Sequence, residues 1–391
     1  MIRFIKLITI LVLLHFLLLG CGESKTIVQQ TEDELALRQL LDVPDHMAIP
    51  DFPDYNPPTQ EKITLGRHLF YDNKLSANQT QSCSSCHVQS LAFADGKKAP
   101  EGSTGTVLAR NSQGLANAVY HSTLTWANNG LLHLEEQLVI PIRADNPIEL
   151  GVTDAVVDEV LARFDNDEHY VDLFKAAFPE SDTGATMNKI IFAIASFCRS
   201  MISGSSAYDR FINGDKSALT EQQIKGFALF NGERFECFHC HSGINFSTSY
   251  RDFNSENTSI KFPFFNNGLY NVGGLGDYPA IDQGLSDISL KPGDRGKFRP
   301  QSLRNVALTA PYMHDGSIET LREVVEHYVA GGRNIESGPY AGDGRANPNK
   351  SGLIRAFDAS DEEIDAVVAF LESLTDFEFI NNPKFSNPFE E

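Results

Sequence analysis

The sequence predicts an all-α fold of two small helical domains with long loops around them. Apolar residues recur at the spacing of an amphipathic helix in residues 154–164, 187–201, 320–329 and 362–374. A unit of one helix, a short loop and a cysteine pair occurs twice along the chain. Residues 247–303 are rich in glycine, asparagine and proline, which favours loops over helices and strands.

The N-terminal segment is typical of an exported protein. Arg3 and Lys6 precede an apolar run that is too short to span a bilayer, as in a secretory signal peptide. The run LLGC, which ends at Cys21, resembles the bacterial lipobox, where cleavage leaves a lipidated cysteine. An ordinary signal peptide with an unrelated cysteine is the alternative. We expect a signal peptide over 1–20, a tether over 21–50, and a protein held by lipid on the periplasmic side of a bacterial membrane.

The composition limits the kinds of partner. Without residues 1–20, 30 basic residues remain against 52 acidic ones, a net charge of −22. Such a surface repels nucleic acid and anionic lipid headgroups. We therefore expect no nucleic-acid partner and membrane contact through the lipid alone. The length suggests two domains, which we place at residues 51–215 and 216–391, with a linker near 203–217 that is rich in glycine, serine and turn-forming residues.

An internal repeat supports this division. Residues 62–87 (KITLGRHLFYDNKLSANQTQSCSSCH) resemble residues 223–241 (QIKGFALFNGERFECFHCH): a helical run with a Gly-x-x-Leu-Phe pattern, a loop and a cysteine pair. The second helix is preceded by Thr220, with Gln223 three residues on, which is a capping-box pattern. Ser360 and Glu363 form the same pattern before the last helix.

The chemistry of the cysteine pairs follows from the residue after each pair. A Cys-x-x-Cys pair alone fits zinc, a redox disulfide or haem. Here a histidine follows directly in both copies, and in C-x-x-C-H the thiols bond to the haem vinyl groups while the imidazole ligates iron. We therefore predict two covalently bound haem c groups in cytochrome c-type domains. Their anchors are Cys83, Cys86 and His87, and Cys237, Cys240 and His241. We expect His239 to point outward and Cys198 to be a buried free thiol.

Longer motifs carry a resemblance to a known family. FRPQSLRNVALTAPYMHDGSIETLREVVEHY, LFYDNKLS and LTWANNGLLHLEEQLVIPIRADNPIELG, together with the paired haem motifs, resemble the bacterial di-haem cytochrome c peroxidase and MauG superfamily over residues 64–374. The likeness is strongest to the methanobactin-associated di-haem enzymes, which share the pattern around LTWAN and P-ELG. The resemblance implies a peroxidase-type oxidoreductase that acts on hydrogen peroxide.

For the first haem the resemblance implies an open distal side. Family members that need reductive activation close this haem with a loop histidine, and the matching position here is Ser103. No histidine lies between His87 and His121. A ligand from a distant segment, such as His121 or His133, is the alternative.

The resemblance also implies two catalytic residues. The family glutamate that moves a proton between the peroxide oxygens matches Glu149, and such acid–base catalysis is worth about 10²–10⁴-fold. We expect Glu135 and Glu136 to be surface charges of a helix instead. Trp126, the one tryptophan of the chain, would fill a core on general grounds. The family places a tryptophan here between the haems, where it carries charge.

For the second haem the resemblance implies a tyrosine ligand. Where family peroxidases have an axial methionine, this chain has Tyr328, as in the MauG-type branch. Met313 and His327 are rival ligands, although His327 would point about 100° away from Tyr328 on a helix. A tyrosinate favours the higher oxidation states of iron, whereas methionine raises the potential. The resemblance thus implies a high-valent, bis-Fe(IV)-like state shared by the two haems.

A calcium site is also implied by the family. It uses one asparagine side chain and two backbone carbonyls, which match Asn111, Thr309 and Pro311. Oxygen ligands of these kinds suit Ca²⁺.

Three functions remain possible at this stage. The first is a peroxide-driven oxidase that modifies a small exported partner protein at a tryptophan or similar side chain. The second is a periplasmic cytochrome c peroxidase that takes electrons from a small redox protein. The third is a non-enzymatic di-haem electron carrier. The open first haem and Glu149 disfavour the third, and Tyr328 in place of methionine favours the first.

Overall fold

The computed structural model describes residues 31–255 and 261–390. The predicted signal peptide and the lipidation site at Cys21 lie outside these residues. Residues 1–36 and 37–391 form two separate units. The described part of the first unit is the start of α2 (Glu32–Leu40), where Thr31 and Glu34 cap each other's backbone N–H groups. Among the described residues, no helix combines the length and the apolar character needed to cross a membrane. Everything below concerns the second unit.

The regular structure is helical, as predicted: 38% of the described residues lie in helices and few in strands. The helices are α3 (Gln60–Tyr71), α4 (Leu134–Gln137), α5 (Val139–Arg143), α6 (Val157–Asp165), α7 (Glu168–Ala177), α8 (Met187–Arg199), α9 (Ala207–Ile212), α10 (Glu221–Phe230), α11 (Ser286–Ser289), α12 (Leu321–Val329), α13 (Asp361–Glu372) and α14 (Phe377–Ile380). The strands β1 (Asn334–Ile335) and β2 (Gly342–Asp343) form one short antiparallel pair. Both capping boxes expected from the sequence are present, at α10 and at α13.

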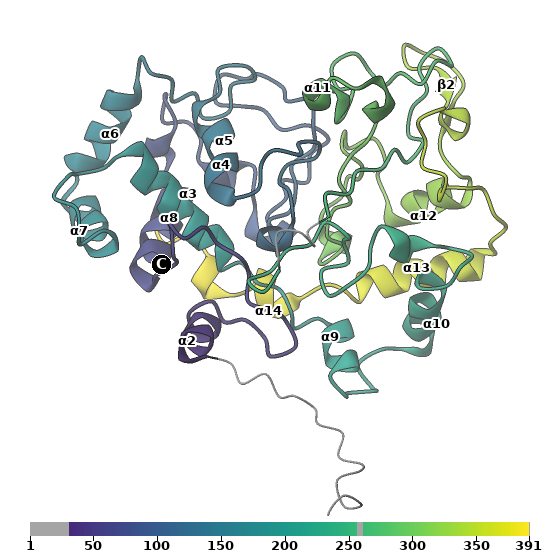
Figure 1. Ribbon diagram of the computed structural model, residues 1–391, viewed down its shortest axis with the longest axis horizontal. Coiled ribbons are helices and arrows are strands. Elements are labelled where there is room, and N and C mark those ends of the chain that lie inside the picture. Colours follow the sequence, from purple (N-terminus) through teal and green to yellow (C-terminus); the bar gives the residue numbers. More distant parts are fainter. Residues whose placement is uncertain (1–30, 256–260, 391) are drawn as a thin grey trace, which may run out of the picture. The chain divides into compact units, whose positions relative to one another are not determined.

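The sequence repeat has a structural counterpart in two helix pairs. α3 packs against α8, and α10 packs against α13 (Figure 1). Each pair is in close contact at the glycine of the repeat. A Cβ on Gly66 would lie 2.0 Å from the Ala193 carbonyl oxygen, and a Cβ on Gly226 would lie 1.8 Å from the Ala366 carbonyl oxygen. The glycine of the shared Gly-x-x-Leu-Phe pattern is therefore required in both copies, because each helix crosses its partner at a distance that leaves no room for a side chain.

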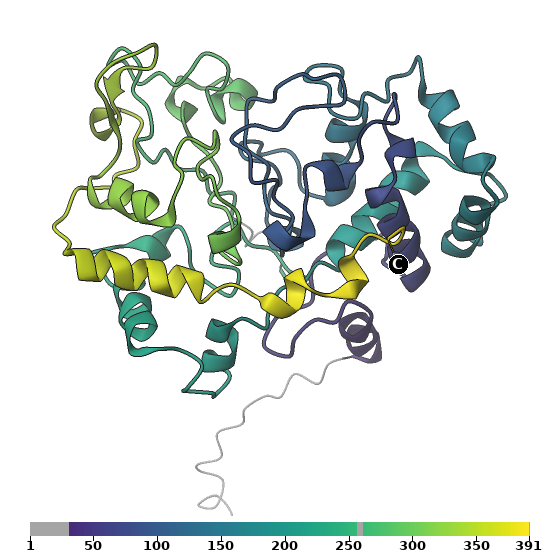
Figure 2. The same cartoon turned by 180° about the vertical axis from the view of Figure 1, so that it is seen from behind.

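Three hydrophobic clusters fill the interior. The first surrounds α3 and α8, the second lies between α10, α12 and α13, and the third is formed by the loops around Tyr270 and Phe298. The chain after α13 crosses back towards α3 (Figure 1, Figure 2), where Phe379 and Phe385 join the first cluster. The Tyr71 hydroxyl donates to the Phe385 carbonyl over 2.5 Å. The C-terminal segment thus packs with the N-terminal haem motif.

Two segments are more tightly packed than the sequence suggested. Leu41, Val43 and Met47, which fall in the expected tether, are buried in the first cluster. The expected linker at 203–217 contains α9, and Asp209 in that helix is 1% exposed. Both segments hold buried residues because they have partners far away in the sequence, which local composition does not reveal.

Gly226→Ala tests the close helix crossing. The added methyl group would collide with the α13 backbone, so we expect the free energy of unfolding to fall by about 1–3 kcal/mol. Gly352→Ala is the control, because nothing lies within 4 Å of a Cβ at Gly352, and its effect should stay within about 0.5 kcal/mol. Urea unfolding followed by circular dichroism measures both variants. Equal stabilities of the two would contradict the packing described here.

Candidate functional site

The first Cys-x-x-Cys-His motif forms a tight turn that fixes its histidine. Cys83–Ser85 form a short 3₁₀ helix, and the Cys86 N–H donates to the Cys83 carbonyl over 3.2 Å. His87 Nδ1 lies 2.6 Å from the Phe93 carbonyl oxygen. Since a carbonyl only accepts, Nδ1 carries the proton and Nε2 keeps its lone pair. Burial lowers the pKa of His87, which favours the neutral imidazole. A histidine that binds a metal through one ring nitrogen usually donates the N–H of the other to a carbonyl or carboxylate.

The second motif repeats this arrangement. Cys237–His239 form the short helix η5, and the Cys240 N–H donates to the Cys237 carbonyl over 3.2 Å. His241 Nδ1 lies 3.1 Å from the Phe246 carbonyl oxygen and 3.2 Å from that of Gln301. Burial lowers the pKa of His241 as well. Both histidines therefore present a neutral Nε2, as an iron ligand must.

The thiols fit haem attachment better than the alternatives weighed from the sequence. The four cysteines of the two motifs are free, and burial raises the pKa of Cys86 to about 11 and of Cys237 and Cys240 to about 12. Reactive redox cysteines instead have a lowered pKa. Within residues 31–255 and 261–390, no cluster of metal-ligating side chains includes any of these cysteines. Cys198 is buried and free, as predicted.

A cavity of about 460 Å³ lies beside the second motif. Cys237, Cys240 and His241 line it together with apolar side chains of α12 and of the third cluster, such as Val325 and Phe298. Binding sites for flat apolar cofactors commonly have this lining, with a few polar groups at fixed points. The residues present fit a haem c group at this position.

The three rival ligands of the second haem differ in where their side chains lie. Tyr328 lines the cavity, and burial raises the pKa of its hydroxyl to about 12. Met313 also lines the cavity, but its sulfur accepts from Asn267 Nδ2 over 3.3 Å. His327 is not among the lining residues, and its Nε2 lies 3.0 Å from the Asn267 carbonyl oxygen. Tyr328 also has a side-chain hydrogen bond with Asn267, so all three side chains contact this residue, but only Tyr328 and Met313 line the cavity.

Trp126 and the predicted calcium ligands lie on the wall of the same cavity. The Trp126 indole N–H donates to the Asn111 carbonyl over 2.8 Å. Asn111, Thr309 and Pro311 are brought together here although almost 200 residues separate them. Asn111 Nδ2 donates to the Lys97 carbonyl over 2.7 Å, which turns Oδ1 away as the atom left for a cation.

Ser103 and Glu149 lie together near the first motif. The Ser103 N–H donates to the Glu149 carbonyl over 2.8 Å, and the buried Ser103 Oγ has no partner among the described residues. Burial raises the pKa of the Glu149 carboxyl to about 6. Glu149 is also close enough to Cys86 to add to the rise that burial causes in the pKa of that thiol. The structure therefore places an acid of near-neutral pKa beside the first motif.

Within residues 31–255 and 261–390, neither of the two histidines considered as distant ligands of the first haem forms a hydrogen bond with the first motif. His121 lines the cavity of the second motif, and its Nδ1 is 3.1 Å from the Ser249 carbonyl oxygen. His133 precedes α4, where its backbone N–H contacts the Glu136 carboxylate at 3.3 Å.

The expectation for Glu135 was wrong. It is 4% exposed rather than on the surface, and it accepts bonds from Arg199 at 3.0 and 3.2 Å and from Asn56 at 2.6 Å. The positive charge of Arg199 at the end of α8 makes burial of this carboxylate possible. Glu136 is exposed, as expected.

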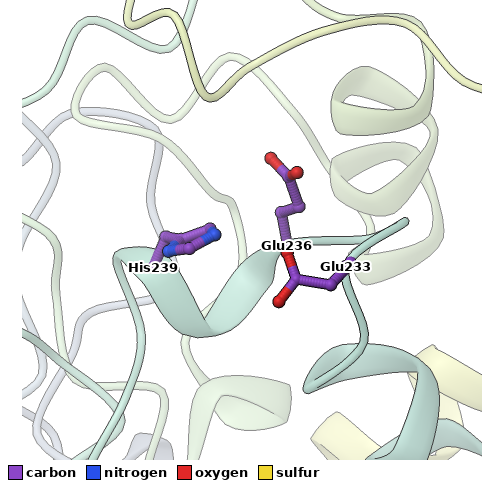
Figure 3. Close-up of side chains that lie close together, drawn as sticks. All are labelled: Glu233, Glu236 and His239. Carbon is purple, nitrogen blue, oxygen red and sulfur yellow. The ribbon is translucent and has the colours of Figure 1, made fainter.

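A small polar cluster borders the second motif. Glu233, Glu236 and His239 lie on either side of the η5 turn (Figure 3), with ligand atoms within 4.8 Å of one another. His239 is partly exposed and takes no part in the histidine–carbonyl arrangement of His241. Both glutamates also line the cavity, so this rim of the second haem site is acidic.

Comparisons with known proteins agree with this site. The family model for di-haem cytochrome c peroxidase matches residues 60–217. The cytochrome-c peroxidase IdrP1 of Pseudomonas sp. (strain SCT) is 36% identical over 338 residues, 83% of each chain. The methylamine utilization protein MauG of Methylophilus methylotrophus is 30% identical over 82% of this chain and 84% of its own. The crystal structure of a MauG-like protein associated with microbial copper homeostasis is 46% identical, with a TM-score of 0.87 over 89% of this chain and 99% of that one.

The chain belongs to the di-haem cytochrome c peroxidase family. It is therefore a di-haem oxidoreductase that acts on hydrogen peroxide, with two haem c groups. The sequence did not reveal the carbonyls of Phe93, Phe246 and Gln301 behind the ligand histidines, nor the Asn267 contacts. A backbone carbonyl can belong to any residue type, so the sequence gives no sign of it. Asn267 lies in a loop that is distant from α12 in the sequence, although the two are in contact.

Glu149→Gln tests the proton-transfer role. We expect the rate constant for reaction with hydrogen peroxide to fall about 10²–10⁴-fold. Since the pKa of Glu149 is about 6, the proton-accepting carboxylate forms as pH rises, and the wild-type rate should climb through that pH. The variant should lose this climb, whereas the exposed control Glu136→Gln should keep both rate and profile. Stopped-flow absorbance measures all three. A pH profile that survives in Glu149→Gln would refute the role.

Proposed function

We propose that this protein uses hydrogen peroxide to oxidise a tryptophan or similar side chain on a small exported partner protein. The observation that carries the proposal is Tyr328, which faces the cavity of the second motif where a methionine would serve a donor-dependent peroxidase. The similarity to MauG proteins and to a MauG-like protein associated with microbial copper homeostasis supports it. A partner that binds copper fits the same association.

At the first motif Ser103 and Glu149 would have different roles in the reaction with peroxide. When bound, the haem groups supply the redox chemistry with peroxide and hold the resulting oxidising equivalents. Ser103 stands where relatives that need activation have a loop histidine, so this position would supply no imidazole to exclude peroxide. The Glu149 carboxylate would accept a proton from one oxygen of the peroxide and return it to the other. Its near-neutral pKa suits both halves of this transfer.

At the second motif His241 and Tyr328 would be the side chains that bind the haem iron. A tyrosinate is a hard anionic ligand, so it stabilises oxidised iron. The pKa of the buried Tyr328 hydroxyl is about 12, so the hydroxyl keeps its proton at neutral pH when no iron is bound. Iron binding would therefore have to displace this proton. Trp126 would carry charge between the two sites, held in place by its bond to Asn111. Asn111 Oδ1 and the carbonyls of Thr309 and Pro311 would hold a Ca²⁺ ion there.

The site of action is the periplasmic side of the membrane. Haem c attachment occurs in that compartment, and the lipid at Cys21 would hold the enzyme at the membrane. Its acidic surface favours partners that are neutral or basic where they touch.

A cytochrome c peroxidase with a small redox-protein donor is the second candidate. Its specific support is the similarity to the peroxidase IdrP1, which is higher in identity than that to MauG. The two functions differ in where the electrons come from, so they can be separated by experiment. A simple electron carrier would have no use for Glu149 beside the first motif.

The test compares wild type with Tyr328→Met. Periplasmic extract from the bacterium grown with scarce copper is treated with enzyme and peroxide, and mass spectrometry detects oxygen added to tryptophan. We expect wild type to modify one small protein and Tyr328→Met to lose at least about tenfold of that activity, equivalent to about 1.4 kcal/mol of barrier. Oxidation of reduced mammalian cytochrome c is measured in parallel. Fast cytochrome oxidation without protein modification by wild type would establish the second candidate instead.

A further inference from the structure

Two buried hydrogen-bond donors on the wall of the second cavity have no partner. They are Nη1 of Arg299 and Nε2 of Gln301. Both residues line the cavity, and Arg299 is only 3% exposed. A buried donor without an acceptor costs about 1–3 kcal/mol, and more when it is charged. Such donors therefore point to a ligand that supplies the missing acceptors.

The other polar atoms of the pair fix its orientation. Arg299 Nε donates to the Thr125 carbonyl over 3.0 Å, and Nη2 donates to Oε1 of Gln113 at 2.8 Å and to Oε1 of Gln301 at 2.9 Å. The last contact sets which end of the Gln301 amide faces Arg299, so Nε2 is left as its free end. The two orphan donors thus belong to adjacent, immobilised side chains.

The pair also lacks a counter-charge. Arg299 forms no ion pair with any acidic side chain of the described residues, and its near neighbours are neutral amides and a carbonyl. Burial lowers the pKa of its guanidinium to about 9, which reflects the cost of an uncompensated charge. Another buried arginine on the same cavity, Arg304, differs in this respect because it pairs with Asp209 at 2.8 and 2.9 Å.

We propose that Arg299 and Gln301 form the receptor for a carboxylate side chain of the haem bound at the second motif. Nη1 of the guanidinium and Nε2 of the neighbouring amide are two free donors, one of them charged, that can each bond to one oxygen of a carboxylate. The cavity holds the haem anchors Cys237 and Cys240 together with these donors, and a propionate brings the missing negative charge with it. The inference rests on the haem content of this site and not on the identity of the oxidised partner.

This receptor would couple three parts of the site. The Gln301 carbonyl lies 3.2 Å from Nδ1 of the ligand His241. The Arg299 N–H donates to the Trp126 carbonyl over 2.8 Å. One short segment would therefore hold the carboxylate, orient the proximal histidine and fix the backbone of Trp126. Arg299 and Gln301 are positioning residues in this scheme.

The test replaces Arg299 in the intact di-haem protein. Removal of a nearby buried positive charge should lower the equilibrium constant for reduction of the second haem about tenfold in Arg299→Gln, equivalent to about 59 mV for one electron. Arg299→Lys should recover most of this change. Spectroelectrochemical titration measures the constant, and resonance Raman of the propionate bending mode reports the lost hydrogen bond. The control Arg355→Gln removes the same charge from an exposed arginine on the same cavity and should change both signals little.

Further outcomes decide the case. Gln301→Leu keeps the guanidinium, so it should shift the propionate mode with a smaller change in the constant, and it serves if Arg299→Gln does not fold. Unchanged Raman and redox signals in a folded Arg299→Gln or Gln301→Leu protein would overturn the proposal. So would a larger shift in Arg355→Gln. The reduction constant of the second haem in wild type could also change with phosphate concentration at fixed ionic strength. That result would show that Arg299 and Gln301 hold a free anion, and it would overturn the proposal.

Discussion

The buried ion pair between Arg304 and Asp209 is the constraint that holds together the segments around the second haem motif, because Arg304 also donates to the Ile244 carbonyl and Tyr208 packs in the second cluster. Both side chains are almost fully buried, and two hydrogen bonds join them. Asp209 lies in the first predicted domain and Arg304 in the second. Burial alone would raise the pKa of Asp209, but the Arg304 guanidinium holds it below the usual range. Asp376 supports the same junction by accepting bonds from the Ser203 hydroxyl and the Gly204 N–H. Loss of one partner of such a pair typically costs about 3–5 kcal/mol, so the pair fixes α9 against the segment that carries Gln301 and Arg304.

The features that could be predicted from sequence are those whose chemistry is local. Covalent haem attachment needs two cysteines and a histidine within five residues, so the motifs at Cys83 and Cys237 are visible without a structure. Helix periodicity and capping boxes are equally local, and the repeat around Gly66 and Gly226 follows from backbone contact in each helix pair. The roles of Glu149, Tyr328 and the calcium ligands were predicted from the resemblance to a family. Each role depends on a bound group and on residues distant in the sequence, which local patterns do not reveal. Tyr328 and the predicted calcium ligands line one cavity, and Glu149 lies near Cys86, so their roles can be tested.

The features that could not be predicted depend on partners distant in sequence. Glu135 seemed a surface charge because its partner Arg199 lies 64 residues away. The segment around Asp209 had the composition of a linker, yet its carboxylate pairs with Arg304, 95 residues on. The packing of Phe385 beside α3 joins opposite ends of the chain. Arg299 and Gln301 gave no signal either, since what singles them out is the absence of a partner in three dimensions.

We infer that the two haem sites are unequal: the first would have an open side next to Glu149, and the second would be closed by Tyr328. The most direct measurement is a low-temperature EPR spectrum of the purified ferric protein. The account predicts one high-spin signal, from the five-coordinate haem at His87, and one low-spin signal, from the six-coordinate haem at His241. Two low-spin signals would contradict it, because an additional side chain would then close the first haem.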